Sequence, residues 1–207
     1  MRGIRTAVCL LAFASATVHG GTIGLVPDPD PGRHGQLVRG AELALQGGPG
    51  SPRLAVGRPA GHWNGLTAVI EELIAGEGAE VLLAPADRRA AHLVAQIATR
   101  RHLPAVATSA SDGLAATGSW WFVTCDWEDR EPALLAERLG RPPSEWEAAG
   151  WSAARLARLL LEASSGSWAS PGSAWRELLP ESCLAADPRP ATQQASSQVT
   201  RRDDPDR

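Results

Sequence analysis

The sequence predicts an α/β fold: a doubly wound, mostly parallel sheet of about five strands within a three-layer sandwich. Three observations lead to this prediction. Short β-rich runs recur along the chain, longer helical patterns separate them, and turn residues close several of the runs. Strands that alternate with helices imply βαβ units around a parallel sheet. Right-handed crossovers then place helices on both faces of that sheet.

The predicted strands are short apolar runs. They cover residues 22–26, 53–56, 80–83, 105–107 and 121–124. A turn-rich segment at residues 27–32 closes the first run, and Pro85 closes the third. Ligands of doubly wound sheets bind beyond the carboxyl ends of the strands. Here those ends are residues 27–35, 58–62, 85–88, 108–112 and 125–127.

The predicted helices have apolar residues at helical spacing. The clearest pattern consists of Leu66, Val69, Ile70, Leu73 and Ile74. The remaining helices are expected at residues 36–45, 90–99, 132–139 and 144–163. The last one carries an apolar stripe of Trp146, Ala149, Ala153, Leu156 and Leu160. This stripe needs a partner surface, so we expect the helix to join the core of the strands.

The N-terminus has the layout of a secretory signal peptide. Arg2 and Arg5 precede a short apolar stretch at residues 6–16, and small residues follow. Residues 1–20 are therefore expected to be removed on export to the periplasm, with cleavage after Gly20 or Ala16. A buried N-terminal helix or strand is the alternative. At the other end, residues 184–207 contain almost no large apolar side chain and are expected to be a disordered tail.

Composition excludes several functions. The chain has 207 residues and a formal charge of -3, which argues against binding nucleic acid. All of its basic residues are arginine, so a catalytic lysine and the phosphate-binding lysine of a P-loop are excluded. The histidines are scattered away from the cysteines, so we expect no zinc site and no cofactor. In an exported protein Cys125 and Cys183 would form one disulfide or remain two buried thiols; both interpretations stay open.

No catalytic constellation is evident, so an enzyme is not expected. Ser109, His92 and Asp112 have the residue types of a triad, but Ser109 lacks the Gly-x-Ser-x-Gly elbow. The first predicted strand is not followed by Gly-x-Gly-x-x-Gly, so dinucleotide binding has no support.

Several motifs occur in a recognisable order. They are Ile23-Gly24-Leu25-Val26, Gly35-Gln36, residues 39–44, residues 79–85, residues 102–111 and Trp121-Phe122-Val123-Thr124. Together they resemble the opening of type I periplasmic solute-binding proteins, which serve ABC importers of branched-chain amino acids and related solutes. Residues 139–144 and 148–156 resemble the late helix of the same family, which returns to the first lobe. Trp151 stands where the family commonly has Tyr.

The resemblance implies a chain with one lobe. Family members carry a second α/β lobe between the two matches, and here only a short connection separates them. Residues 21–183 would then form a single lobe of the type I fold. Residues 21–126 would supply the strands and helices, and residues 132–183 the returning helices.

The resemblance also suggests ligand-binding residues. Ser109, Ala110 and Ser111 align with the family's Ser/Ala-Ala-Thr segment, which grips the ligand; without the resemblance they would be a polar turn. Asp87 and Arg88 stand where the family has a serine pair. Asp87 is also a candidate helix N-cap. Arg88 would either be solvated or pair with a carboxylate.

The leading hypothesis is a one-lobed, solute-binding-protein-like component of an ABC-type amino-acid import system. Its ligand would be a small polar molecule such as an amino acid or carboxylate, bound weakly or not at all by one lobe. An ABC permease or another periplasmic protein would be its partner. The alternatives are a protein-interaction module, with Trp63, Trp127 and Trp151 lining an exposed face, and a truncated paralogue without activity.

Overall fold

All five predicted strands are present in the computed structural model, which describes residues 20–48, 50–59, 63–109, 120–123 and 131–164. The strands are β1 (Thr22–Leu25), β2 (Arg53–Val56), β3 (Ala79–Ala84), β4 (Ala105–Ala107) and β5 (Trp121–Val123). They form one sheet in the order β2-β1-β3-β4-β5, and every neighbouring pair is parallel. The prediction of a doubly wound parallel α/β sheet is confirmed.

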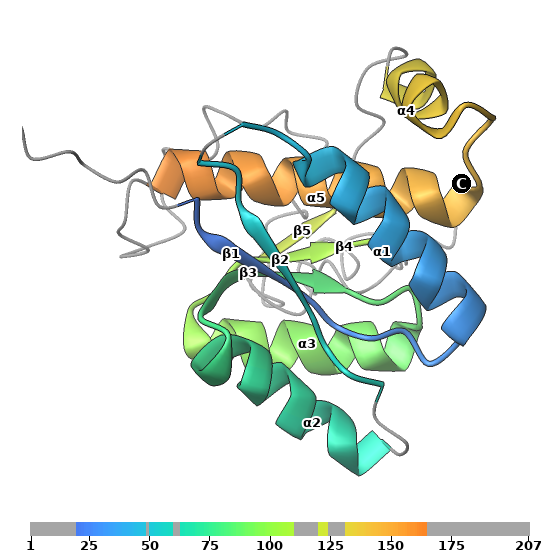
Figure 1. Ribbon diagram of the computed structural model, residues 1–207. Helices are drawn as coiled ribbons and strands as arrows, with labels where there is room; N and C mark the ends of the chain where they lie inside the picture. Colours follow the sequence, from blue (N-terminus) through green and yellow to red (C-terminus); the bar gives the residue numbers. More distant parts are fainter. Residues whose placement is uncertain (1–19, 49, 60–62, 110–119, 124–130, 165–207) are drawn as a thin grey trace, which may run out of the picture.

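Helices cover both faces of this sheet (Figure 1). They are α1 (Pro31–Leu45), α2 (Trp63–Glu71), α3 (Arg88–Arg101), α4 (Glu131–Leu139) and α5 (Glu145–Ser164). The π-helix η1 (Glu72–Gly76) continues α2. Helices α1 and α5 cover one face, and α2 and α3 cover the other (Figure 1). The three layers are thus helix, sheet and helix. No helix among the described residues is both long enough and apolar enough to cross a membrane.

Helix α1 begins earlier than its apolar pattern predicts. The segment at residues 27–32 was expected to be a loop, but the helix starts at Pro31. The Asp30 side chain caps it by accepting hydrogen bonds from the backbone N–H groups of Gly32, at 2.8 Å, and Arg33, at 3.1 Å. Proline is favoured in the first turn of a helix because its missing N–H is not needed there. The apolar stripe starts only at Leu37, so periodicity alone misses this first turn.

Two core clusters lie on opposite faces of the sheet. The cluster under α1 and α5 includes Ile23, Val81 and Val106 from the strands and Leu156 and Leu160 from α5. The cluster under α2 and α3 includes Leu66, Ile70, Leu73, Val94 and Ile97. Helix α5 therefore packs on the same sheet that the first half of the chain builds. Of its predicted stripe, Trp146 and Ala149 are half-buried and the other three residues are buried.

Two glycines let α1 and α5 approach closely. A Cβ atom on Gly40 would collide with the backbone carbonyl of Glu147, and one on Gly150 would collide with the carbonyl of Leu37. Each glycine thus faces the backbone of the other helix. The absence of both side chains is what allows this close crossing.

Several sequence predictions fall outside the described residues. These are the leader at residues 1–19, Cys125 and Cys183, Ala110 and Ser111, Trp127, and the tail at residues 184–207. The side chain of Trp63 is likewise not described. Of the predicted returning helices at residues 132–183, the structure describes the part up to residue 164.

Candidate functional site

The carboxyl ends of β1 and β3 form the topological switch point of the sheet. The two strands are neighbours, yet the chain leaves β1 for α1 on one face and leaves β3 for α3 on the other. Connections that diverge in this way open a crevice at the sheet edge, where doubly wound folds bind ligands. The candidate site therefore consists of the β1–α1 and β3–α3 loops.

Asp28 joins these two loops. Its side chain is completely buried. One carboxylate oxygen, Oδ2, accepts hydrogen bonds from the backbone N–H groups of Ala86, at 2.9 Å, and Asp87, at 3.3 Å. The other oxygen, Oδ1, accepts from the N–H of Asp30, at 2.9 Å, and binds the guanidinium of Arg33 through Nε, at 2.8 Å, and Nη2, at 2.7 Å. The buried charge of Asp28 is thus paired and fully hydrogen-bonded.

A second carboxylate caps α3. Asp87 Oδ1 accepts hydrogen bonds from the backbone N–H groups of Arg89, at 3.0 Å, and Ala90, at 2.9 Å. The interpretation of Asp87 as an N-cap is confirmed. A helix N-terminus attracts anions through its unpaired N–H groups and its dipole. Here Asp28 and Asp87 already supply that negative charge, so most of the N–H groups that would hold a ligand carboxylate are occupied by the protein.

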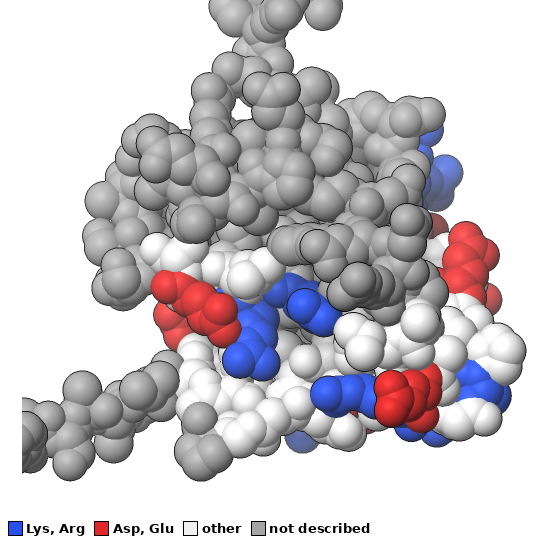
Figure 2. Space-filling model, turned by 90° about the horizontal axis from the view of Figure 1, so that it is seen from above, with Lys and Arg blue, Asp and Glu red and all other residues white. Residues whose placement is uncertain are grey.

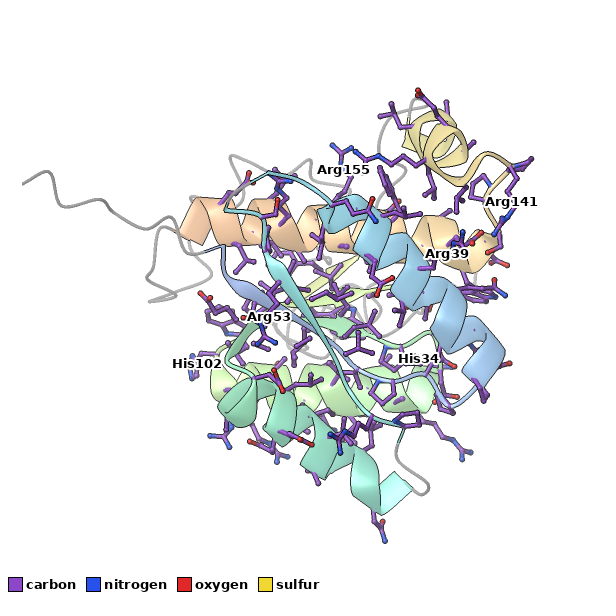
Figure 3. All side chains as sticks on the ribbon, in the orientation of Figure 1. His34, Arg39, Arg53, His102, Arg141 and Arg155 are labelled. Carbon is purple, nitrogen blue, oxygen red and sulfur yellow. The ribbon has the colours of Figure 1, made fainter. Side chains whose placement is uncertain are left out.

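The charge of Asp28 and burial shift the pKa values of two neighbouring side chains. The hydrogen bond to Asp28 raises the pKa of the Arg33 guanidinium, which also lies 5.3 Å from the centre of the Trp146 ring. Half-buried His34 has its pKa lowered by desolvation, and its Nδ1 accepts a long hydrogen bond of 3.4 Å from the Asp28 N–H. His34 lies at the start of α1, next to this edge of the sheet (Figure 3). At neutral pH a neutral imidazole therefore borders the Asp28–Arg33 pair.

The structure places three of the predicted ligand-binding residues. Asp87 and Arg88 begin α3, and Arg88 is exposed, as the solvated interpretation expects. Ser109 follows β4 and is half-buried. Next to it, the Thr108 hydroxyl donates a 2.9 Å hydrogen bond to the carbonyl of Ala84 and so joins the ends of β4 and β3. All of these positions lie at the carboxyl edge of the sheet.

Sequence reasoning missed Asp28 and Arg33. Asp28 stands between two prolines, in a segment that the sequence predicts to be a turn-rich loop. Its partners Ala86 and Asp87 lie far along the chain, so no local pattern reveals this contact. The alternative of a protein-interaction module places Trp151 on an exposed face; this part of the alternative is wrong, because the residue is only 4% exposed and belongs to the core under α1 and α5.

A second buried carboxylate fixes the start of α5. Glu147 accepts hydrogen bonds from the Arg141 guanidinium, at 2.6 and 2.9 Å, and from the Ser144 backbone N–H, at 2.8 Å. The Ser144 hydroxyl in turn accepts from the Glu147 N–H, at 3.1 Å. This reciprocal pair is a capping box, which the Ser-x-x-Glu spacing would have predicted. The Arg141 hydrogen bonds lower the pKa of Glu147 to about 2 despite its burial.

Several arginines among the described residues form ion pairs with acidic residues. Arg39 and Arg141 both lie close to Glu147, where α1 crosses α5 (Figure 3). In the view of Figure 2 the described red and blue side chains lie next to one another, without a broad field of one sign. Among the described residues no cluster of histidine, cysteine and acidic side chains could hold a metal ion.

No protein-family model matches the sequence, and a comparison with curated proteins finds no significant match. Solved structures that are similar to this chain include solute-binding proteins of ABC transporters. One from Rhodopseudomonas palustris BisB5, in complex with 3,4-dihydroxybenzoic acid, has a TM-score of 0.44 and 14% identity over 67% of this chain and 44% of its own.

Two further structures give similar values. The branched-chain amino acid transporter substrate-binding protein of Streptococcus pneumoniae, in complex with isoleucine, has a TM-score of 0.45 and 18% identity over 58% of this chain and 39% of its own. A second R. palustris protein, in complex with benzoate, has a TM-score of 0.44 and 18% identity over 66% and 45%. The chain thus spans less than half the length of these proteins.

Proposed function

We propose that this chain is a solute-binding-protein-like component of an ABC-type import system, reduced to one lobe and weak in ligand binding by itself. The proposal rests on the ordered motifs along residues 22–126 and 139–156, together with the position of α5. A late helix that returns to the first lobe is what the resemblance implies, and α5 packs on the sheet in that way. The proposal places the chain in the periplasm, with an ABC permease as its partner.

The proposed ligand is a small molecule with a carboxylate, such as an amino acid. It would bind at the carboxyl edge of the sheet, near Asp87, Arg88 and Ser109. One lobe covers only one side of such a ligand, so less surface is buried than in a closed cleft and water reaches the polar contacts. Asp28 and Asp87 also occupy N–H groups of the β3–α3 loop and of the first turn of α3, and their charges repel a carboxylate there. Weak binding follows from both effects.

The buried Asp28 at the switch point is the observation that carries the weak-binding part of the proposal. We therefore expect isothermal titration calorimetry of the full chain with isoleucine or benzoate to show a Kd on the order of 1 mM or weaker. A Kd below about 10 μM for either ligand would overturn this part.

The solute-binding part is tested by restoring the family's serine pair with Asp87→Ser and Arg88→Ser in one variant. Serine is as good an N-cap as aspartate, so α3 keeps its start. Replacing Asp87 removes the negative charge that repels a ligand carboxylate, and the serine hydroxyl can donate a hydrogen bond to that carboxylate. We expect this variant to bind isoleucine or benzoate at least tenfold more tightly than the natural chain. Arg88→Ser alone, which keeps the Asp87 charge, is the matched control. If the double variant binds no better than this control, the strand edge is not a carboxylate site.

A further inference from the structure

Helix α3 carries positive charge that no acidic residue within the helix balances. Residues 88–101 include four arginines and no aspartate or glutamate. Arg101 forms an ion pair with Glu71 of α2. The other three, Arg88, Arg89 and Arg100, are exposed, and none of them forms a hydrogen bond or an ion pair through its side chain with another described residue. We call these three residues the α3 arginines; their guanidinium groups are free to bind a partner.

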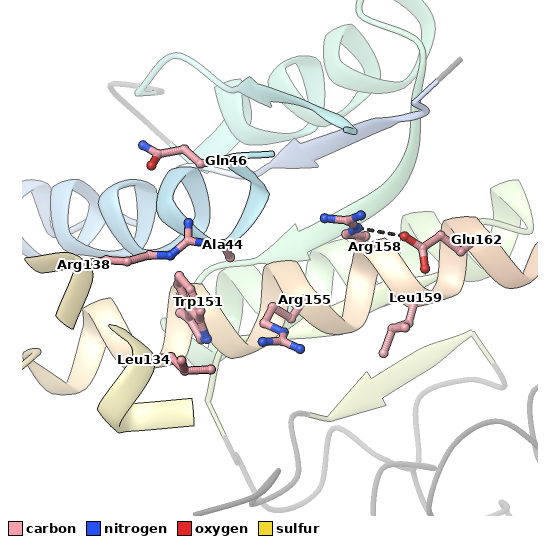
Figure 4. Close-up of a pocket in the computed structure, with 9 residues that line it drawn as sticks. All are labelled: Ala44, Gln46, Leu134, Arg138, Trp151, Arg155, Arg158, Leu159 and Glu162. Atoms are coloured by element: carbon pink, nitrogen blue, oxygen red, sulfur yellow. Dashed lines mark hydrogen bonds and ion pairs between the residues drawn. The ribbon is translucent and has the colours of Figure 1, made fainter. Parts of the chain in front are cut away.

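Two arginines that line the cavity between α1, α4 and α5 are, by contrast, already bonded within the protein (Figure 4). Arg158 forms an ion pair of 2.7 Å with Glu162, and Arg138 donates a hydrogen bond of 2.8 Å to the carbonyl of Leu43. Guanidinium groups only donate hydrogen bonds, so these two have less capacity left for an anionic ligand. The α3 arginines are the better candidates for contact with an anionic partner.

The acidic residues near α3 do not cancel this charge. Glu71 is paired with the fourth arginine of the helix, and Glu77, which follows η1, is paired with Arg53. Asp87 precedes α3 and accepts hydrogen bonds from backbone N–H groups of its first turn. Among the described acidic residues within α2, η1 and α3, Glu72 alone has no ion pair. This layer therefore has an excess of positive charge.

The α3 arginines are spread along the helix rather than gathered at one point. Arg89 and Arg100 lie about 16 Å apart along the helix axis and face nearly the same direction. The exposed side chains between them are His92 and Gln96, which share a hydrogen bond of 2.9 Å and carry no negative charge. A single small anion cannot contact both ends of this row, so the geometry favours an extended anionic surface.

The helices on the other face of the sheet are too far away to repel such a surface. Helices α1 and α5 lie across the sheet from α3 (Figure 1). A helix is about 10 Å across, whereas the Debye length is about 8 Å at physiological ionic strength. A flat surface in contact with α3 is therefore screened from the acidic residues of α1 and α5. The formal charge of -3 for the whole chain does not prevent binding on this side.

We infer that the exposed face of α3 binds the surface of a membrane that contains anionic phospholipids. The α3 arginines bond headgroup phosphates, which a planar guanidinium holds through two N–H groups. Headgroups move laterally and can meet arginines about 16 Å apart, whereas an acidic protein would need carboxylates at matching positions. The contact is peripheral, because Ala90, Val94 and Ile97 hold the apolar face of α3 against the sheet.

Sedimentation of the full chain with lipid vesicles tests the inference. One set of vesicles contains phosphatidylglycerol and phosphatidylcholine in equal amounts, and the other contains phosphatidylcholine alone. At about 10 mM NaCl, where the Debye length is about 30 Å, we expect the chain to sediment with the mixed vesicles only. It should be released at about 1 M NaCl, where the Debye length is about 3 Å. Failure to bind the mixed vesicles, or binding that persists at high salt, would overturn the inference.

Two triple variants locate the surface. Replacement of all three α3 arginines by glutamine should weaken vesicle binding about 100-fold, since each arginine near an anionic membrane is worth about fivefold in affinity. The matched control carries Arg39→Gln, Arg53→Gln and Arg158→Gln, which remove the same charge from exposed arginines that have acidic partners outside α3. Circular dichroism checks that both variants fold. If the control weakens binding as much, net charge and not the α3 face is responsible, and the inference is wrong.

Poly-glutamate separates a membrane from an acidic protein as the partner. If the chain binds poly-glutamate through the α3 arginines but does not bind the vesicles, the face fits an acidic protein and the membrane inference is wrong. Arg88 also borders the proposed ligand site at the sheet edge. The sedimentation test contains neither solute nor permease, however, so its outcome does not depend on the proposed function.

Discussion

Gly40 of α1 lies directly against the backbone carbonyl of Glu147 in α5, with no space for a side chain between the two helices. Gly150 makes the reciprocal contact with the carbonyl of Leu37. The two glycines thereby set the distance between the helices that cover one face of the sheet. Helix α1 lies in the first segment that resembles the solute-binding family, residues 22–126, and the contact residues of α5 lie in the second, residues 139–156. This contact therefore joins the two segments.

The first prediction is that Gly40→Ala destabilises the protein. The added methyl group would overlap the Glu147 carbonyl, which is backbone and cannot turn aside as a flexible side chain would. Overpacking of this kind costs about 1–3 kcal/mol in the free energy of unfolding. Urea denaturation followed by circular dichroism measures it.

Gly35→Ala is the control on the same helix. Gly35 is exposed, and nothing lies within 4 Å of the position of its Cβ. Alanine favours helix more than glycine does, so this variant should gain up to about 1 kcal/mol. If both variants have the same stability, the close contact at Gly40 has no energetic effect.

The second prediction concerns Leu156, which is fully buried between α5 and the sheet. Leu156→Ala should lower the free energy of unfolding by about 2–5 kcal/mol, as other large-to-small core substitutions do. Leu159→Ala, one turn along the same helix at an exposed position, should change it by less than about 0.5 kcal/mol. The transition of Leu156→Ala should remain single by circular dichroism and by fluorescence. Two separated transitions would mean that α5 unfolds independently of the sheet.

The sequence was sufficient to predict the α/β fold because its signals are local and repeated. The apolar spacing of Leu66, Ile70 and Leu73 identifies α2 and its continuation, and the short run at residues 105–107 coincides with β4. Such patterns report which face of an element is buried. They do not require knowledge of any contact between distant residues.

The candidate site was less predictable because its main contacts join distant residues. The carboxylate of Asp28 has a structural role only once β1 and β3 are neighbours and the N–H groups of Ala86 and Asp87 come within reach. Trp151 was misplaced for a similar reason. Its position on α5 does not by itself decide whether the side chain is buried or exposed. Only the packing of α1 and α4 against α5 buries it.

The third prediction is that Asp28→Ala is strongly destabilising. The variant leaves the N–H groups of Ala86 and Asp87 without their acceptor and removes the partner of Arg33. We expect a loss of about 2–4 kcal/mol in the free energy of unfolding. Glu77→Ala is the control, because the Arg53–Glu77 pair is exposed and such pairs contribute about 1 kcal/mol or less. A loss for Asp28→Ala no greater than for Glu77→Ala would show that the buried network does not stabilise the two loops.

The fourth prediction is a dependence of stability on pH that originates at Glu147. Hydrogen bonds from Arg141 lower the pKa of this carboxylate from 4.5 to about 2 in the folded protein. A group with a lowered pKa in the folded state releases its proton more readily there than in the unfolded chain. Its stabilising contribution is therefore complete above pH 4.5, decreases as the pH falls through the interval from 4.5 to about 2, and is lost below.

Comparison with Glu147→Gln isolates this contribution from the other carboxylates. At pH 7 the variant should be less stable than the natural chain by about 2–3 kcal/mol, since each unit of pKa shift corresponds to about 1.4 kcal/mol and the half-exposed Arg141 is partly screened by solvent. The difference should shrink steadily between pH 4.5 and pH 2 in urea denaturation series. Glu162→Gln, which alters an exposed pair with Arg158, should differ from the natural chain by about 0.5 kcal/mol or less at every pH. A difference for Glu147→Gln that stays constant down to pH 2 would contradict the prediction, because it would mean that the stabilisation does not require the ionised carboxylate.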